Sequence, residues 1–260
     1  MYTKTHKAHT MPRIIAISNQ KGGVGKTTTA YTLQYALAER GRNGIIIDLD
    51  PQASLTSMYG FVNPEKTVAD SMALGCSDRS EALMDCLVSV DNNWALAPAD
   101  ILLSEVERTL PAQRFSGTVL KKALSDLPPI DYVLIDCLPS LGVLAFNALI
   151  AADEVLIPTQ PEGVAIRAMP VLFRAIEEAK EGNPALSILG ILPTMVDPRT
   201  VLHAEIIKAM QGNGWPILDI SIARSIKMAE APNMSQSILT YAPDSPQAEA
   251  YKKLAEFIDG

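Results

Sequence analysis

The sequence is poor in the residues that build disulfide scaffolds and metal centres. It has only three cysteines, Cys76, Cys86 and Cys137, and three histidines in 260 residues. The cysteines are odd in number and form no CxxC pair, which favours reduced thiols over a secreted disulfide framework. The histidines are too few and too scattered to suggest a metal site. These absences predict a chain that works in the reducing cytoplasm.

Long apolar runs and an excess of positive charge are missing as well. The most apolar stretch, residues 141–152, contains Asn147 and is too short to span a bilayer, and the N-terminus lacks the apolar core of a signal peptide. The net charge is −7, so the chain does not coat nucleic acid through bulk charge. We therefore expect no membrane association, and any DNA contact must come from a local basic patch.

The composition that remains is that of an ordinary globular domain. Hydrophobic residues make up 48% and charged residues 20% of the sequence. We expect residues 1–11 to form a disordered lead, with Met1 or Met11 as the native start, and residues 12–260 to form a single domain. So few residues precede the first expected strand that an N-terminal helix-turn-helix is not expected.

Short β-branched runs alternate with helical patterns along the chain. Apolar runs predict strands at Ile14–Ser18, Ile45–Asp48, Tyr132–Asp136, Glu154–Pro158 and Leu186–Pro193, with a weaker strand at Trp94–Ala97. A helix is expected up to Arg40, where Gly41 ends it, and another from Pro246 with Ser245 as its N-cap. The pattern predicts an α/β fold, a mostly parallel twisted sheet with helices on both faces and binding loops at the carboxyl ends of the strands.

The strongest motif lies between the first expected strand and the first helix. It reads Asn19-Gln20-Lys21-Gly22-Gly23-Val24-Gly25-Lys26-Thr27-Thr28. Glycines allow backbone N–H groups to face phosphate oxygens, and the following helix N-terminus adds positive potential. Lys26 is expected at the β- and γ-phosphates, Thr27 at Mg²⁺ and Thr28 at the α-phosphate. A simple glycine-rich turn with incidental lysines is the competing interpretation, and the strand-loop-helix setting disfavours it.

The loop departs from the usual P-loop at its first glycine. Gln20 stands at that position and Lys21 follows it. This KGGVGKTT form resembles the deviant Walker A signature of the ParA and MinD superfamily, and the chain is most similar to the short, Soj-like ParA partition ATPases. The resemblance implies that Lys21 reaches the partner's phosphates across an ATP-dependent nucleotide-sandwich homodimer, supplying charge much as an arginine finger does. A solvated loop lysine is the alternative.

Three aspartates follow expected strands. Asp48 and Asp50 lie two apart at the end of the second strand, so both side chains are expected to face the phosphate loop. Asp136 closes the fourth expected strand, as a Walker B aspartate that holds Mg²⁺ through water does. The resemblance implies that Asp50 activates the attacking water and that Asp48 lies nearer the metal. Taken alone, such aspartates are more often turn or N-cap residues.

The resemblance extends over residues 12–258 and includes three further blocks. Residues 136–142, 190–200 and 222–232 match ParA motifs, with Leu138, Ala223 and Ser225 as departures. By resemblance, Met195, Ala223 and Ser225 contact adenine, and adenosine is preferred over guanosine. The Ala223 and Ser225 departures put the side-chain contacts in doubt.

Short ParA proteins bind DNA without sequence preference as ATP-bound dimers. The matching basic positions are Arg199, Arg224 and Lys227. Acidic residues offset the basic ones from 195 to 230, so a solvated charged face is the alternative. The resemblance implies an ATPase that uses ATP and Mg²⁺, associates with the nucleoid and segregates or positions cargo, with hydrolysis stimulated by a ParB-like or cargo-adaptor protein.

Other functions remain as alternatives at this stage. A protein cargo such as a carboxysome would require the same biochemistry as a plasmid or chromosome. A MinD-like membrane switch would need a basic amphipathic last helix, whereas residues 246–259 are mixed in charge. Iron–sulfur relatives would need more clustered cysteines. A metabolic P-loop synthetase would not need Lys21 or the late blocks.

Overall fold

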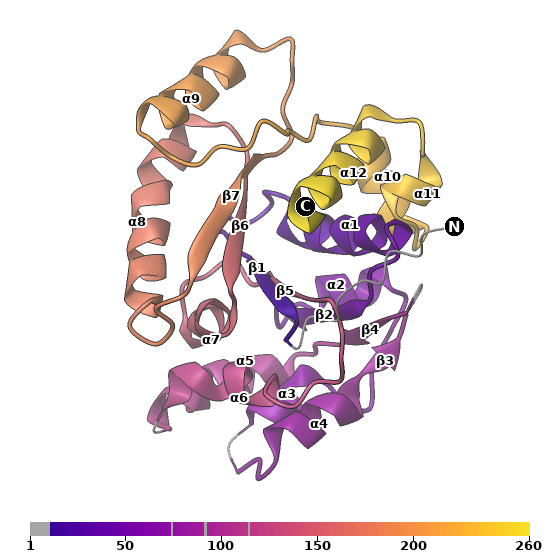
Figure 1. Cartoon of the computed structure of the whole chain (residues 1–260), viewed down its shortest axis with the longest axis vertical. Helices are drawn as coiled ribbons and strands as arrows, with labels where there is room; N and C mark the ends of the chain where they lie inside the picture. The colour runs from indigo at the N-terminus through magenta and orange to yellow at the C-terminus, as the bar shows by residue number, and fades with distance from the viewer. Residues whose placement is uncertain (1–10, 74, 91–92, 114) are drawn as a thin grey trace, which may run out of the picture.

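The computed structural model describes residues 11–73, 75–90, 93–113 and 115–260 and places a seven-stranded sheet at the centre of the chain (Figure 1). Of the expected lead, only Met11 lies within the described residues. The strands are β1 (Arg13–Ile17), β2 (Gly44–Leu49), β3 (Val88–Ser89), β4 (Trp94–Ala97), β5 (Tyr132–Cys137), β6 (Glu154–Thr159) and β7 (Ser187–Pro193). They stand in the order β3-β4-β2-β5-β1-β6-β7, and every pairing is parallel except the edge pair β3–β4.

The register of the central strands determines which residues meet at the carboxyl edge. On β5, Asp136 pairs with Ile17 of β1 on one side and with Asp48 of β2 on the other. Because the strands are parallel, the loops that leave β1, β2 and β5 emerge at the same edge. The phosphate loop therefore begins next to two aspartates that are far from it in the sequence.

Helices cover both faces of the sheet. They are α1 (Lys26–Glu39), α2 (Ser54–Met58), α3 (Val68–Met72), α4 (Arg79–Cys86), α5 (Leu102–Thr109), α6 (Val119–Ala123), α7 (Val143–Ala151), α8 (Gly163–Ala179), α9 (Val201–Gly212), α10 (Lys227–Asn233), α11 (Ile238–Tyr241) and α12 (Pro246–Asp259), with 3₁₀ turns η1 (Leu110–Ala112) and η2 (Ser116–Thr118). In Figure 1 α1 and α12 lie together on one side, while α3, α4, α5 and α6 gather on the other. The mostly parallel α/β sheet with helices on both faces is confirmed.

The sheet has a hydrophobic core on each face, and the alternation of side-chain direction along the strands explains how one strand contributes to both. On β2, Ile46 faces the core under α1 and α12, whereas Ile45 and Ile47 face the core under α3 to α8. Side chains two apart on a strand share a face, so one run of isoleucines supplies both cores. The last helix begins as predicted, since Ser245 accepts a hydrogen bond from the N–H of Ala248, and its apolar face is buried against α1.

The sequence did not predict one of the strands. β3 has only two residues, Val88 and Ser89, and pairs antiparallel at the edge of the sheet. A pattern of two residues carries no periodicity that could predict it. As a consequence, Asp136 closes the fifth strand along the chain instead of the fourth.

Candidate nucleotide site

The loop between β1 and α1 has the backbone of a phosphate cradle. Gly23 and Gly25 adopt left-handed conformations, with φ of 71° and 87°, and a Cβ at either position would meet no atom within 4 Å. Side chains rarely adopt this conformation, so glycine is required there and leaves open space above the loop. Gly25 is also the N-cap of α1 and has no side chain to cap the first turn, so that turn's N–H groups can donate hydrogen bonds to a bound anion.

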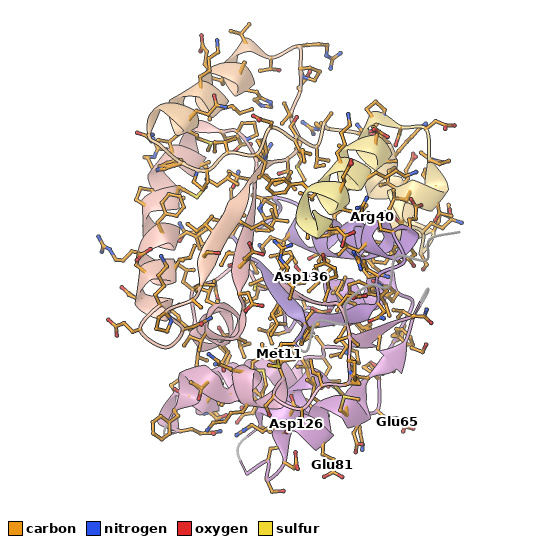
Figure 2. The ribbon with its side chains drawn as sticks, viewed as in Figure 1. Met11, Arg40, Glu65, Glu81, Asp126 and Asp136 are labelled. Atoms are coloured by element: carbon orange, nitrogen blue, oxygen red, sulfur yellow. The ribbon has the colours of Figure 1, made fainter. Side chains whose placement is uncertain are left out.

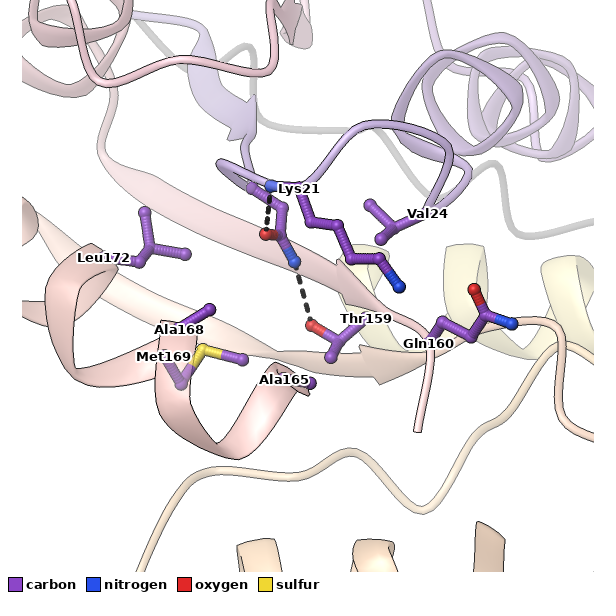
Figure 3. Close-up of a pocket in the computed structure, with 9 residues that line it drawn as sticks. Lys21, Val24, Thr159, Gln160, Ala165, Ala168, Met169 and Leu172 are labelled. Carbon is purple, nitrogen blue, oxygen red and sulfur yellow. Dashed lines mark hydrogen bonds between the residues drawn. The ribbon is translucent and has the colours of Figure 1, made fainter. Parts of the chain in front are cut away.

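The loop is tied to the ends of β6 and β7 by buried hydrogen bonds. The amide of Asn19 donates to the Pro158 carbonyl at 2.8 Å and to Thr159 Oγ1 at 3.2 Å, while its oxygen accepts the N–H of Lys21. Figure 3 shows Lys21 and Val24 above Thr159 of β6 and the inner face of α8. From β7, the Thr194 hydroxyl donates to the Val24 carbonyl at 2.7 Å. These contacts hold the loop in place before any ligand binds.

Lys26 lies inside the loop, and its side chain is almost fully buried. Its ammonium donates to the Lys21 carbonyl at 3.2 Å. Burial lowers the pKa of Lys26, and the nearby charges of Asp136 and Asp50 oppose this shift. A buried ammonium whose acceptor among the described residues is a backbone carbonyl is well placed to exchange it for phosphate oxygens.

Asp136 is completely buried, and neither of its carboxylate oxygens accepts a hydrogen bond from the described residues. In Figure 2 it lies in the middle of the molecule, whereas Glu65, Glu81 and Asp126 extend from the outer surface. Burial, followed by the charge of Asp48, raises the pKa of Asp136 well above its usual value, and Thr27 and Lys26 oppose this rise. A buried carboxylate with no hydrogen-bond partner among the described residues is costly, so a bound cation would stabilise it.

Asp48 is buried beside Asp136, but its oxygens already have partners. The N–H and the hydroxyl of Thr56 donate to Oδ2 at 2.8 and 2.7 Å, and the N–H of Asp50 donates to Oδ1 at 3.2 Å. Burial raises the pKa of Asp48 to about 6, against these hydrogen bonds. The side chain therefore shapes the turn between β2 and α2, and metal coordination by Asp48 stays a prediction.

Asp50 lies just past β2, on the partly exposed side of the same turn. Its carboxylate accepts the N–H of Gln52 at 2.9 Å, and its carbonyl accepts the N–H of Ala53, which has a left-handed φ of 52°. Asp48 is fully buried and Asp50 is partly exposed, and the orientation of both side chains toward the phosphate loop stays a prediction. Asp50 remains near enough to Lys26 to influence its pKa.

Lys21 lies at the start of the loop with its side chain partly exposed, whereas Lys26 is buried. Its Nζ pairs with Glu162 Oε2 at 2.6 Å, with both side chains partly exposed. Glu162 is the N-cap of α8, and the neighbouring Gln20 donates to the Ala168 carbonyl of the same helix. The extra lysine is thus linked to α8 in this conformation.

A cavity of about 280 Å³ opens beside the phosphate loop, where the resemblance implies the adenine. Its lining includes all three expected base contacts, and the full set is Gly25, Thr28, Thr194, Met195, Ile222, Ala223, Arg224, Ser225, Met228, Ala229 and Tyr251. Met195 has a left-handed φ of 52°, a strained conformation that is typical of binding sites. The Ser225 hydroxyl accepts the N–H of Lys227, and the Ala223 carbonyl accepts the amide of Gln247.

The three basic residues expected at DNA lie at or beside a second cavity, of about 560 Å³. Arg199 and Arg224 line it, and Lys227 follows at the start of α10. Arg224 and Lys227 are exposed and form no ion pair within the described part of the chain. Arg199, however, is paired with Asp197.

Sequence reasoning missed several residues of this site. Thr194, Met228 and Tyr251 line the base cavity, and Glu162 holds Lys21. Thr194 lies within a block that matched ParA, so its hydroxyl was available as a signal. Glu162 and Tyr251 lie in a loop and on a helical core face, where the sequence alone indicates only a cap and a packed ring.

These residues fit a nucleotide with Mg²⁺. The glycine cradle has room for phosphates, and the orphaned carboxylate of Asp136 suits a divalent cation bound directly or through water. No three His, Cys, Asp or Glu side chains of the described residues gather into a preformed metal cluster. Mg²⁺ commonly takes one or two protein ligands and completes its shell with water and substrate phosphates.

Known proteins of similar sequence include chromosome-partitioning ATPases. A family model described as an AAA domain matches residues 12–188. The chain is 40% identical to the chromosome-partitioning ATPase Soj of Thermus thermophilus over 248 residues, covering 94% of both proteins. It is 37% identical to the chromosome partitioning protein ParA of Caulobacter vibrioides, covering 94% of this chain and 92% of that protein.

The chain belongs to the ParA/MinD superfamily of P-loop ATPases. Among solved structures, it resembles the cobyrinic acid a,c-diamide synthase of Mycobacterium smegmatis with bound ATP analogue and magnesium, with a TM-score of 0.81, 35% identity and coverage of 95% of this chain and 93% of that one. It also resembles the Cyanothece McdA(D38A)–ATP complex, with a TM-score of 0.83, 26% identity and coverage of 96% and 98%. Within the described residues, this ParA-family chain has no helix long and apolar enough to cross a membrane.

Proposed function

We propose that this ParA-family ATPase is a positioning switch, in which an ATP-bound homodimer binds duplex DNA without sequence preference and a partner protein triggers hydrolysis and release. The cargo is a plasmid or chromosome, as the names of the Soj and ParA relatives suggest. A protein cargo on the nucleoid is the alternative. The observation that carries the proposal is the placement of two lysines, one inside the phosphate loop and one outside it.

The inner residues bind and activate ATP. Lys26 and the first-turn N–H groups of Thr27 and Thr28 hold the phosphates, and Met195, Ala223 and Ser225 border the base. The backbone of Gly22, Gly23, Val24 and Gly25 supports the phosphates from below. Positioning and electrostatics of this kind supply most of the catalysis in phosphoryl transfer.

The aspartates provide the acidic half of the site. Thr27 and Asp136 would hold Mg²⁺, which neutralises charge that develops on the phosphates, and Asp48 supports the turn that carries Asp50. Asp50 is partly exposed at the carboxyl edge, so it can accept a proton from an attacking water. No covalent intermediate is required.

The position of Lys21 is an argument for the proposed dimer. Its ammonium is partly exposed and pairs with Glu162, and Lys26 already serves the inner site. A lysine in this place can serve the phosphates of a second copy facing the same edge, which would make ATP binding and dimerisation interdependent. The ion pair with Glu162 has to open for that contact.

The basic residues support DNA binding. Arg199 and Arg224 share one cavity, and Lys227 extends the positive charge along α10. A chain with a net charge of −7 needs such a local patch, and doubling it in a dimer gives enough phosphate contacts for salt-dependent binding. Nucleoid association in the ATP-bound state follows from the proposal.

A gel-shift titration of non-specific duplex DNA with protein, ATP and Mg²⁺ tests the switch. We expect a shift with ATP that is absent with ADP, is lost in Lys21→Ala, and weakens as salt increases. The triple variant Arg199→Ala, Arg224→Ala, Lys227→Ala should lose the shift and still form the dimer. Absence of a shift in every nucleotide state would remove DNA from the proposal.

A second assay addresses the synthase name of one solved relative. A synthase couples ATP cleavage to a second substrate, whereas a positioning ATPase hydrolyses ATP with water alone. We expect slow phosphate release without added substrate and faster release with DNA and the partner present. ATP consumption that required a small acid and ammonia or glutamine would favour the synthase.

A further inference from the structure

The cavity beside Arg199 lies between the loop after β7 and the start of α10. Its walls come from Val196, Asp197, Pro198 and Arg199 on one side and from Ala223, Arg224, Ser225, Ile226 and Ala229 on the other. The two sides are fixed to each other, because the Arg224 N–H donates to the Val196 carbonyl at 2.9 Å. With a volume of about 560 Å³ and two arginines, the cavity suits a phosphate group.

One anion already faces this cavity from within the chain. Arg199 donates from Nε and Nη2 to the two oxygens of Asp197, at 3.1 and 3.0 Å. Arginine binds phosphate in the same bidentate geometry. The Arg199 side chain is 87% exposed, so nothing else in the described residues restrains its guanidinium.

Asp197 itself is held firmly in the loop. Its N–H donates to His203 Nδ1 at 3.0 Å, and its Oδ1 also accepts the Arg199 N–H at 3.0 Å. Hydrogen bonds from Arg199 lower the pKa of Asp197 to about 2, so the carboxylate is charged throughout the neutral range. The loop therefore keeps a fixed negative charge beside the arginine expected to contact DNA.

The same segment adjoins the base cavity. Ala223, Arg224, Ser225 and Ala229 line both this cavity and the base cavity. The proposed DNA surface and the base cavity thus share a wall of four residues.

We propose that Asp197 acts as an intramolecular stand-in for a DNA phosphate on Arg199, and that duplex DNA binds by displacing it. This inference rests on the proposed DNA-binding function. Asp197 lowers the affinity of this surface for DNA, because the Asp197–Arg199 ion pair must break before Arg199 can contact a DNA phosphate. An ion pair this exposed is weak, so the pair lowers affinity without blocking the site.

The substitution Asp197→Asn separates charge from structure. Asparagine keeps a side-chain oxygen that can accept the Arg199 N–H, and the backbone contact with His203 is retained. We expect the affinity of the ATP-bound protein for DNA to rise about two- to fivefold per site, from the known range of exposed ion pairs. The matched control is Asp219→Asn, which removes the same charge from an exposed aspartate that makes no ion pair within the described residues.

The measurement is fluorescence anisotropy of a labelled non-specific duplex at saturating ATP and Mg²⁺, over a salt series. Four variants are compared with the wild type: Asp197→Asn, Arg199→Ala, the double variant, and Asp219→Asn. Size-exclusion chromatography on each verifies that dimerisation is unchanged. A double-mutant cycle isolates the Asp197–Arg199 coupling from the general effect of charge.

The expected result is a gain with Asp197→Asn that exceeds the gain with Asp219→Asn and disappears in the Arg199→Ala background. An unchanged or weaker affinity for Asp197→Asn would overturn the inference, because Asp197 would then position Arg199 for DNA. An equal gain in the Arg199→Ala background would overturn it too, leaving only a charge effect. If the wild type binds no DNA, the proposed function fails together with the inference; if it binds normally, only the inference is at stake.

Discussion

Lys21 and Glu162 form an ion pair of 2.6 Å that joins the phosphate loop to the first residue before α8. Both side chains are partly exposed, at 31% and 42%, so water screens the attraction. The pair holds Lys21 on its own protomer. For Lys21 to reach a second copy, this contact must break.

We expect Glu162→Gln to strengthen ATP-dependent dimerisation. Without the carboxylate, Lys21 is released at no electrostatic cost, and the dimer dissociation constant should fall by up to about fivefold for each pair. Analytical ultracentrifugation with a slowly hydrolysed ATP analogue measures this. Glu178→Gln, on the exposed face of the same helix, is the control. A weaker dimer in Glu162→Gln would mean that Glu162 itself contributes to the interface.

Lys26→Ala should abolish nucleotide binding. The ammonium is buried in the loop and its carbonyl partner is easily exchanged for phosphate. Removing one side of a buried charge contact costs at least about 2 kcal/mol, so ATP affinity should fall at least about thirtyfold. Isothermal titration calorimetry provides the affinity, and circular dichroism verifies the fold. Retained ATP affinity would withdraw the phosphate-loop assignment.

Asp50→Ala should separate binding from hydrolysis. Asp50 lies at the edge of the site, and its hydrogen bonds within the described residues stay in its own turn, so ATP binding and dimerisation should persist. Loss of a general base should lower the turnover on the order of a hundredfold or more. Phosphate release and ATP affinity are measured on the same preparation. Turnover equal to the wild type would assign the water-activating role to another group.

Asp136→Asn should stabilise the nucleotide-free protein at neutral pH. The pKa of this carboxyl is raised in the folded state, so its contribution to stability is present at low pH and is lost as pH rises through the folded pKa. The gain from the amide, about 1–3 kcal/mol, should appear near pH 7 and vanish below about pH 4, where the acid is protonated in both states.

Urea unfolding of wild type and Asp136→Asn at both pH values tests this. Asp48 contributes in the same direction, with a folded pKa of about 6, so the wild type should itself lose stability between about pH 4 and pH 6. MgATP binding to Asp136→Asn should be impaired at the same time. A destabilised variant at pH 7 would show that Asp136 is satisfied in solution by a group other than an added cation.

The sequence predicted the parts of this site whose residues are close together along the chain. The glycines, Lys26 and Thr27 follow one another in a strand-loop-helix unit, and the conformation of such a loop depends mainly on its own residues. Alternating apolar runs such as Ile45–Asp48 likewise predicted the strands, because burial on two faces leaves a local pattern. Contact of Met195, Ala223 and Ser225 with adenine was expected only from resemblance; the three residues line one cavity, and their contact with a base stays a prediction.

Pairings between distant segments were decided by the tertiary structure. The register of β2 against β5 places Asp48 beside Asp136, and that register depends on packing across the whole sheet. Lys21 meets Glu162 because α8 begins where β6 ends, beside the phosphate loop. The sequence also left open that the turn after β2 buries Asp48 fully and leaves Asp50 partly exposed. A local pattern fixes which residues are buried, but the partner of each buried charge depends on how separate strands and helices come together in space.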